Sequence, residues 1–303
     1  MGDRSVLHTR ARRALRHESV RTWAALTPAV TLVLTLFGGA VVLALVRSFG
    51  LLGTDPSARP SLDAYRRLLV DPEVGRSLLL TLHVAVVSST LVVVLGIGAA
   101  LLLRGLGRGR RLTTTLFQLN LPVPHVIGAV AILSLLGQSG LLSRAATRIG
   151  MIDEPASFPA LVFDPYAIGI IVQYVWKEVP FVGIVALAIL HSTGDDLEEA
   201  ARTLGATSWQ RLRHVTLPLL LPGVLSAAVI VFAFTFGTFE VPLLLGSSFP
   251  AVLPVLAHQR YTDVDLASRP EAMAISAVIT LLVLAVVVAG TTLARRTVRQ
   301  DAA

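Results

Sequence analysis

The sequence predicts an all-α membrane protein with six transmembrane helices. Of its 303 residues, 54% are hydrophobic and only 15% are charged, and the mean hydropathy is +0.73, which is well outside the usual range for soluble domains. The apolar residues fall in six stretches close to the roughly 20 residues that a helix needs to cross the hydrocarbon core. Arginines cluster beside these stretches, as expected of charges that set membrane topology.

The six predicted spans cover residues 22–47, 77–103, 113–137, 166–191, 219–245 and 271–294. The first follows the charged segment 1–21, which is too long and too charged for a typical signal peptide, so we expect it to be retained as a span. Turn-rich connectors such as LLGTDPSARPS and GSSFPAVLP separate the spans. Without a repeat of fixed period, the simplest organisation is one membrane domain, residues 22–294, between the terminal segments 1–21 and 295–303.

The distribution of arginine predicts the orientation of the chain. Sixteen arginines lie in segments that would share one side of the membrane with the N-terminus, and eight lie in the alternating segments. Because cytoplasmic loops carry an excess of Lys and Arg, both termini and the loop 192–218 are predicted to be cytoplasmic. The net charge of +7 is therefore assigned to topology, and no nucleic-acid partner is expected.

The loop 192–218 is predicted to contain two short helices. Asp195 and Glu198 have the spacing of a capping pair, Gly205 ends the first helix, and Thr207 with Gln210 repeats the capping signature before SWQRLRHV. Apolar side chains of the first helix share one face: Leu197, Ala200, Ala201 and Leu204. Spacing alone fits equally well a loop that rests on lipid headgroups.

The same loop carries a motif. Glu199-Ala200-Ala201, three residues, Gly205, nine residues and Val215-Thr216-Leu217-Pro218 resemble the EAA-x3-G-x9-I-x-L-P loop of binding-protein-dependent ABC importer permeases. Val in place of Ile is the one departure at these positions. We call residues 192–218 the EAA loop. The resemblance covers most of residues 75–295 and implies a type I (MetI-like) permease fold.

In that family the EAA loop acts as a coupling helix that docks onto an ATPase. The resemblance assigns this role to Glu199, Ala200, Ala201, Gly205, Leu217 and Pro218. It also implies two cytoplasmic ATPase subunits, a second and related permease subunit, an external solute-binding protein, and a multi-pass location in the bacterial cytoplasmic membrane.

The sequence independently indicates that the motor is another polypeptide. The only lysine is Lys177, so no G-x-x-x-x-G-K-[ST] phosphate loop can be formed. We therefore expect a transport subunit that is not an enzyme and carries no cofactor, with ATP and Mg on partner ATPase subunits. The absence of cysteine and of clustered ligand motifs predicts no metal site.

The solute class is inferred from weaker signals. Gly194 replaces a proline that is usual in carbohydrate permeases, and FAFTFGTFEVPLLLG and QYVWKEVPF resemble the branch for polyamines, iron, thiamine, sulfate and similar charged solutes, the polyamine and iron types best. Ionisable groups inside spans are costly and face a partner or a wet cavity. Lys177, Glu178 and Glu240 are thus candidate pathway residues. The alternative for Lys177 and Glu178 is a structural ion pair or a contact to the other permease subunit, and that for Glu240 is a position at the outer rim. His125 is expected at a helix break.

Three other functions remain open on the sequence alone. They are a sugar importer permease, a membrane channel or receptor with an amphipathic cytoplasmic loop, and a membrane-embedded enzyme.

Overall fold

The computed structural model describes residues 22–52, 59–106 and 109–300, and these residues form helices and connecting loops without a strand. The predicted helical membrane fold is confirmed. Residues 1–21, whose arginines contribute to the predicted orientation, lie outside the described residues. Six helical segments are long and apolar enough to cross a membrane: Thr22–Ser48, Pro72–Arg104, His125–Arg148, Ile168–Ser192, Ser208–Gly237 and Leu266–Thr292.

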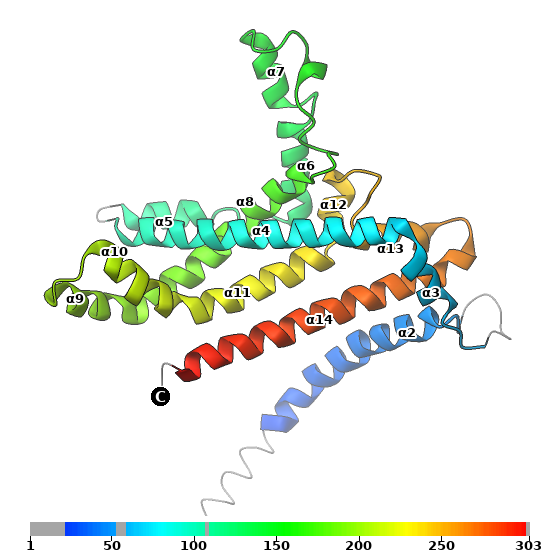
Figure 1. Cartoon of the computed structure of the whole chain (residues 1–303), viewed down its shortest axis with the longest axis horizontal. Coiled ribbons are helices and arrows are strands. Elements are labelled where there is room, and N and C mark those ends of the chain that lie inside the picture. The colour runs from blue at the N-terminus through cyan, green and yellow to red at the C-terminus, as the bar shows by residue number, and fades with distance from the viewer. Residues whose placement is uncertain (1–21, 53–58, 107–108, 301–303) are drawn as a thin grey trace, which may run out of the picture.

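The elements follow one another along a chain that folds back on itself several times (Figure 1). In order they are η1 (Leu34–Gly38), α2 (Gly39–Ser48), α3 (Asp63–Val70), α4 (Pro72–Arg104), α5 (Arg110–Gln118), α6 (His125–Leu136), α7 (Leu141–Arg148), η2 (Pro155–Ser157), α8 (Ile168–Ile189), η3 (Leu190–Gly194), α9 (Asp195–Thr203), α10 (Ser208–Arg211), η4 (Leu212–Thr216), α11 (Leu217–Gly237), α12 (Glu240–Leu245), α13 (Leu253–Thr262), η5 (Leu266–Ser268) and α14 (Arg269–Gln300).

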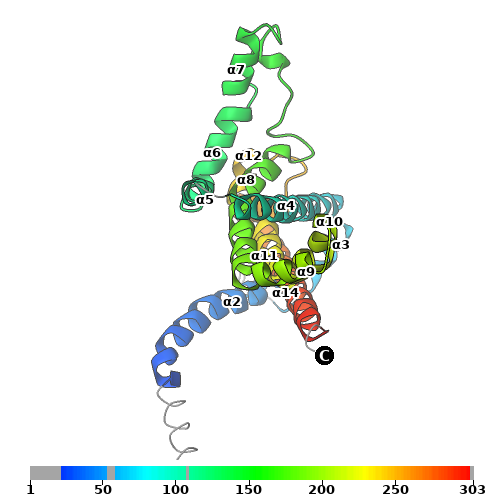
Figure 2. The same ribbon diagram turned by 90° about the vertical axis from the view of Figure 1, so that its left-hand side faces the viewer.

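The body of the molecule is a bundle of α4, α8, α11 and α14. Helix α4 packs along α8 and α11, α14 packs along α11, and α2 lies against α14. Helices α6 and α7 form an arm that projects away from this bundle in both views (Figures 1 and 2). The EAA loop lies at one end of the bundle, while α3 and α13 lie at the opposite end (Figure 1).

Close packing between α4 and α8 depends on glycine. A Cβ atom added to Gly96 would lie 2.9 Å from Cγ1 of Val182, and one added to Gly183 would lie 2.8 Å from the ring of Phe117. Small residues let helix backbones approach closely in membranes, where dispersion contacts drive helix association. Gly96 therefore lets α4 approach α8, and Gly183 makes room on α8 for Phe117 of α5.

The third predicted span, 113–137, is wrong as a single helix. The structure has α5 and α6 with a break over residues 119–124, and the apolar helical stretch continues from α6 into α7. Pro122 and Pro124 explain the break, because proline lacks the N–H that a helix needs and disfavours helical geometry in the residue before it.

The fifth predicted span, 219–245, is also interrupted. Helix α11 ends at Gly237, Thr238 is extended, and a separate short helix α12 begins at Glu240. Inside a membrane such a break is tolerated only where protein or a wet cavity surrounds it. The sequence prediction missed it because the segment around Thr238 and Glu240 is short and apolar residues continue on both sides of it.

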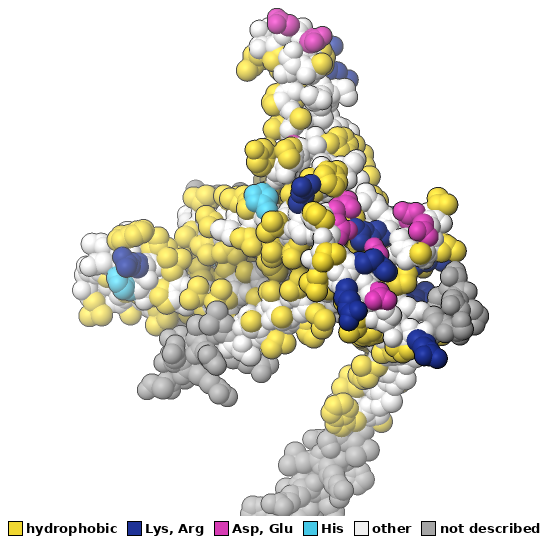
Figure 3. Space-filling model, turned by 45° about the vertical axis from the view of Figure 1, so that its right-hand side comes forward, with side chains coloured by type: hydrophobic (Ala, Val, Ile, Leu, Met, Phe, Trp, Pro, Cys, Tyr) yellow, Lys and Arg dark blue, Asp and Glu magenta, His cyan; other side chains and the backbone are white. Residues whose placement is uncertain are grey.

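The surface matches a membrane-spanning body. Hydrophobic side chains cover the middle of the molecule, whereas charged side chains gather at its ends and at the tip of the arm (Figure 3). The first span contributes to this apolar surface, since none of its most apolar window is buried within the chain. Its hydrophobic residues are therefore left to lipid or to another subunit.

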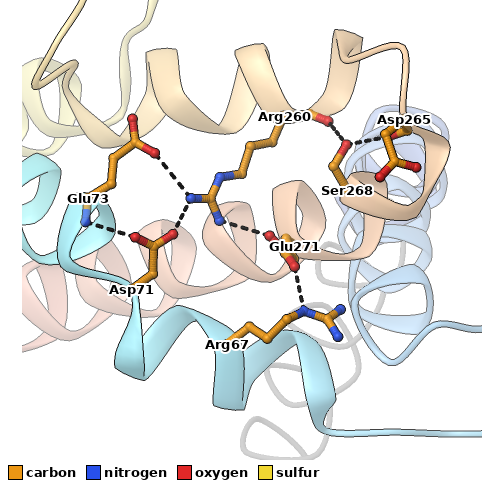
Figure 4. A network of polar contacts seen from close by, with 7 residues as sticks. All are labelled: Arg67, Asp71, Glu73, Arg260, Asp265, Ser268 and Glu271. Carbon is orange, nitrogen blue, oxygen red and sulfur yellow. Dashed lines mark hydrogen bonds and ion pairs between the residues drawn. The ribbon is translucent and has the colours of Figure 1, made fainter.

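A charged network closes the end opposite the EAA loop (Figure 4). Arg260 of α13 donates to Glu271 of α14 at 2.9 Å, to Glu73 of α4 at 3.4 Å, and to Asp71. Arg67 of α3 donates to Glu271 at 2.5 Å. Burial alone would raise the pKa of Asp71, but the hydrogen bond and charge of Arg260 hold it below its ordinary value. This network joins α3, α4, α13 and α14.

Candidate functional site

The EAA loop is built from two short helices with well-defined ends. Helix α9 ends in a left-handed turn in which Gly205 has φ +84°, and the backbone N–H groups of Gly205 and Ala206 donate to the carbonyls of Arg202 and Ala201. This is the Schellman arrangement, in which glycine is preferred because it adopts positive φ without steric cost. The predicted helix end at Gly205 is confirmed.

The second loop helix has the capping box that its sequence predicts. The Thr207 side chain accepts from the N–H of Gln210, and the Gln210 side chain accepts from the N–H of Thr207 at 2.8 Å. Arg211 also donates to the carbonyl of Ala206 at 2.8 Å, which ties α10 to the turn before it. The side chain of Asp195, the other predicted capping residue, lies outside the described part of the chain.

The outer surface of the EAA loop is apolar and exposed. Leu204 is 87% exposed and Trp209 is 65% exposed, and Leu197 is exposed on the same loop. Glu199 and Ala200 are exposed beside them, as are Leu217 and Pro218 at the start of α11. The predicted apolar face of α9 is therefore not packed against the body of this chain.

One residue of α9 instead contacts the body, and the sequence predicted it only as half of a capping pair with Asp195. Glu198 forms an ion pair of 2.9 Å with Arg104, the last residue of α4, and accepts a hydrogen bond from Thr216, which directly precedes α11. Helical periodicity placed Glu198 on a polar face, but only the fold brings Arg104 and Thr216 to it.

A second polar site lies where the third span is interrupted. Lys177 of α8 is buried, and its ammonium donates to the carbonyls of Asn120 at 2.6 Å and Leu121 at 2.7 Å. The side chain of Asn120 donates to the carbonyl of Trp176 in return. The two bonds from Lys177 go to carbonyls in the break after α5, where no helical partner is available.

Glu178 and His125 meet at the same break. The Nε2 atom of His125, the first residue of α6, lies 2.9 Å from Oε1 of Glu178, and Gln173 donates to the carbonyl of His125 at 3.2 Å. The ring of Phe234 from α11 packs on His125 with a centroid distance of 4.6 Å. Helices α6, α8 and α11 thus meet around one polar cluster.

Glu240 lies apart from Lys177 and Glu178, the other two candidate pathway residues. It is the first residue of α12 and is exposed. Tyr174 of α8 is fully buried, and its hydroxyl has no hydrogen-bond partner within the described ranges. The structure therefore brings Lys177 and Glu178 to the interrupted third span and Glu240 to the interrupted fifth span.

The comparison with known proteins decides the family. Residues 92–299 match the family described as the binding-protein-dependent transport system inner membrane component. The chain belongs to this family. It is thus an inner-membrane permease subunit of an ABC importer, and the match includes the whole EAA loop.

Individual relatives of the permease have related descriptions. The molybdenum transport system permease protein ModB of Mycobacterium tuberculosis is 35% identical over 208 residues, which cover 66% of this chain and 74% of the relative. The sulfate transport system permease protein CysT of Escherichia coli is 27% identical over 223 residues, which cover 73% and 77% of the two chains.

Solved structures show the same fold. A chain of a bacterial ABC transporter involved in the import of the acidic polysaccharide alginate superposes with a TM-score of 0.75 at 22% identity, covering 95% of this permease and 99% of that chain. The MetNI methionine ABC transporter gives 0.54 at 21% identity, covering 74% and 95%. Membership of the permease family disfavours the alternatives of a channel, a receptor or a membrane enzyme.

Proposed function

We propose that this permease forms half of the translocation pathway of an ATP-driven importer and that its EAA loop docks onto an ATPase subunit. The observation that carries the proposal is the loop itself, which presents exposed Leu204 and Trp209 on helices held by the Gly205 turn and the Thr207 capping box. Exposed apolar side chains on a rigid element are suited to a protein interface.

The complete importer would contain a second, related permease, two ATPase subunits and an external solute-binding protein. ATP would bind to the ATPase subunits with Mg, since this chain lacks a phosphate loop. Closure of the ATPases would move the two EAA loops, and the spans would then alternate between outward-open and inward-open arrangements.

For the solute we propose a small oxyanion. Relatives described as molybdenum and sulfate permeases support this class, and both belong to the small charged solutes expected from the sequence. A polyamine is the second candidate, favoured by exposed Glu240 at the interrupted fifth span, because a carboxylate offsets part of the dehydration cost of a cation.

Docking is tested with variants of the EAA loop in the co-expressed importer. Glu199→Lys reverses an exposed charge, and Gly205→Val places a β-branched residue at positive φ, where it costs on the order of 1–3 kcal/mol. We expect both variants to insert normally but to co-purify with less ATPase and to transport at least about tenfold more slowly.

Gly205→Asn is the matched control, because asparagine tolerates the left-handed conformation. It should retain most of the ATPase association. If Glu199→Lys and Gly205→Val bind the ATPase and transport as the wild type does, the EAA loop is not the docking element.

The solute is tested through the solute-binding protein of the proposed importer. Calorimetric titration with molybdate, sulfate and spermidine should give tight binding to an oxyanion, and proteoliposomes should accumulate that oxyanion with ATP. Tight binding of spermidine alone would establish the second candidate, and Glu240→Gln should then slow spermidine uptake without changing the affinity of the binding protein.

A further inference from the structure

We infer that Glu198 is a positioning residue that fastens the EAA loop to α4, so that movement of the loop reaches α4 as well as the two helices to which the loop is covalently joined. The inference rests on the proposed docking of the loop to an ATPase. It adds a third helix to the part of the permease that the ATPase moves.

The geometry places Glu198 of α9 between the end of α4 and η4, the segment that leads into α11. Its Oε1 atom lies 2.9 Å from Nη1 of Arg104 and accepts a hydrogen bond from the hydroxyl of Thr216. The side chains of Arg104 and Glu198 are only 16% and 26% exposed, and Thr216 is fully buried. The carboxylate therefore faces the permease, whereas neighbouring Glu199 is exposed.

The EAA loop is joined covalently to α8 and α11 but not to α4, so any attachment to α4 must come from side-chain contacts. The EAA loop continues from α8 through η3 and into α11 through η4, and both junctions are π-helical, a geometry that is rare and often occurs at functional sites. Helix α9 packs against η3, η4 and α10 and makes no extended packing with α4. The ion pair thus provides a specific connection between α9 and α4.

The position of Arg104 makes the connection effective. Its neighbour Leu103 is buried in a core cluster with Leu190 and Leu220, so the end of α4 is anchored beside both ends of the EAA loop. Removing one partner of such a shielded pair leaves the other charge poorly compensated. A shielded pair is also weakened less by salt than an exposed one.

The test uses the assembled importer in nanodiscs, with spin labels on cysteines at Leu102 of α4 and Arg202 of α9, both exposed. In the wild type the distance between the labels should stay the same when vanadate traps nucleotide on the ATPases. In Glu198→Gln the distance should change on trapping, because α9 moves without α4, and ATP-driven uptake should fall about tenfold with ATPase co-purification unchanged.

Asp196→Asn is the matched control, because it removes the same charge from an exposed position on the same helix. It should keep wild-type uptake and a constant distance. The double variant Glu198→Arg with Arg104→Glu should recover uptake above either single charge reversal. A constant distance with normal uptake in Glu198→Gln, an equal loss in Asp196→Asn, or no recovery in the double variant would each overturn the inference.

These outcomes are separate from failure of the proposed function. If the wild-type permease does not co-purify with the ATPase, docking itself is refuted. If docking persists while Glu198→Gln behaves as the wild type, only the connection to α4 is refuted.

Discussion

At the scale of single residues, the structure assigns Lys177 to the support of an interrupted span. Lys177 is buried, and its ammonium donates to two carbonyls in the break after α5. The sequence predicted a costly intramembrane charge but left open whether it contacts solute or structure. A role as solute ligand would require these bonds to be given up during transport.

Lys177→Met is expected to destabilise the folded permease by on the order of 2–3 kcal/mol, because it removes two charge-assisted hydrogen bonds. The carbonyl of Leu121 would lose the bond from Lys177, whereas that of Asn120 would keep the bond from the N–H of Val123. The measurement is thermal unfolding in detergent together with uptake per assembled importer. A solute ligand would behave differently, with uptake abolished and the melting temperature unchanged.

Local features of the EAA loop could be predicted from the sequence, whereas the partners of its polar residues could not. The Gly205 turn and the Thr207 capping box depend on residues within one or two helical turns. Glu198 binds Arg104 of α4. Lys177 binds two carbonyls in the break between α5 and α6, which lie 56 and 57 residues earlier in the chain. Only tertiary packing brings such pairs together.

At the scale of helices, hydropathy predicted the spans but not the breaks inside two of them. Apolar composition predicted the existence of six spans, but α5 with α6, and α11 with α12, are separate helices. Hydropathy does not register a change of backbone direction when the residues on both sides are apolar. The prolines at 122 and 124 and the glycine at 237 were the available signals.

The crossing of α4 and α8 offers a matched pair of glycines. Gly96→Ala would place a methyl group 2.9 Å from Val182, whereas Gly98→Ala meets nothing within 4 Å. We expect Gly96→Ala to lower the melting temperature through overpacking of about 1–3 kcal/mol, and Gly98→Ala to be neutral or slightly stabilising. Equal melting temperatures would show that the crossing can separate without cost.

At the scale of the whole molecule, the arginine distribution predicts which end faces the cytoplasm, and the fold separates the two ends clearly (Figure 1). The EAA loop and the Arg260 network lie at opposite ends. Composition and the EAA motif were sufficient to predict the membrane class and the family. The orientation of both ends remains a prediction.

Cysteine labelling of intact cells tests that orientation, and the natural chain has no cysteine to interfere. Ser248→Cys, in the connector after α12, should react with a membrane-impermeant maleimide from outside. Ser192→Cys, at the start of the EAA loop, should react only after the membrane is permeabilised. The reverse pattern would place the EAA loop outside and refute its role in ATPase docking.

The Arg260 network also has a consequence for the order of assembly during synthesis. Its arginine follows Asp71 by 189 residues, so at the usual rate of about 5–20 residues per second the ribosome needs about 10–40 s between the two. During that interval Asp71 and Glu73 have been synthesised but Arg260, with which both pair in the folded permease, has not. The complete network can therefore form only after α13 and the start of α14, which carries Glu271, have left the ribosome.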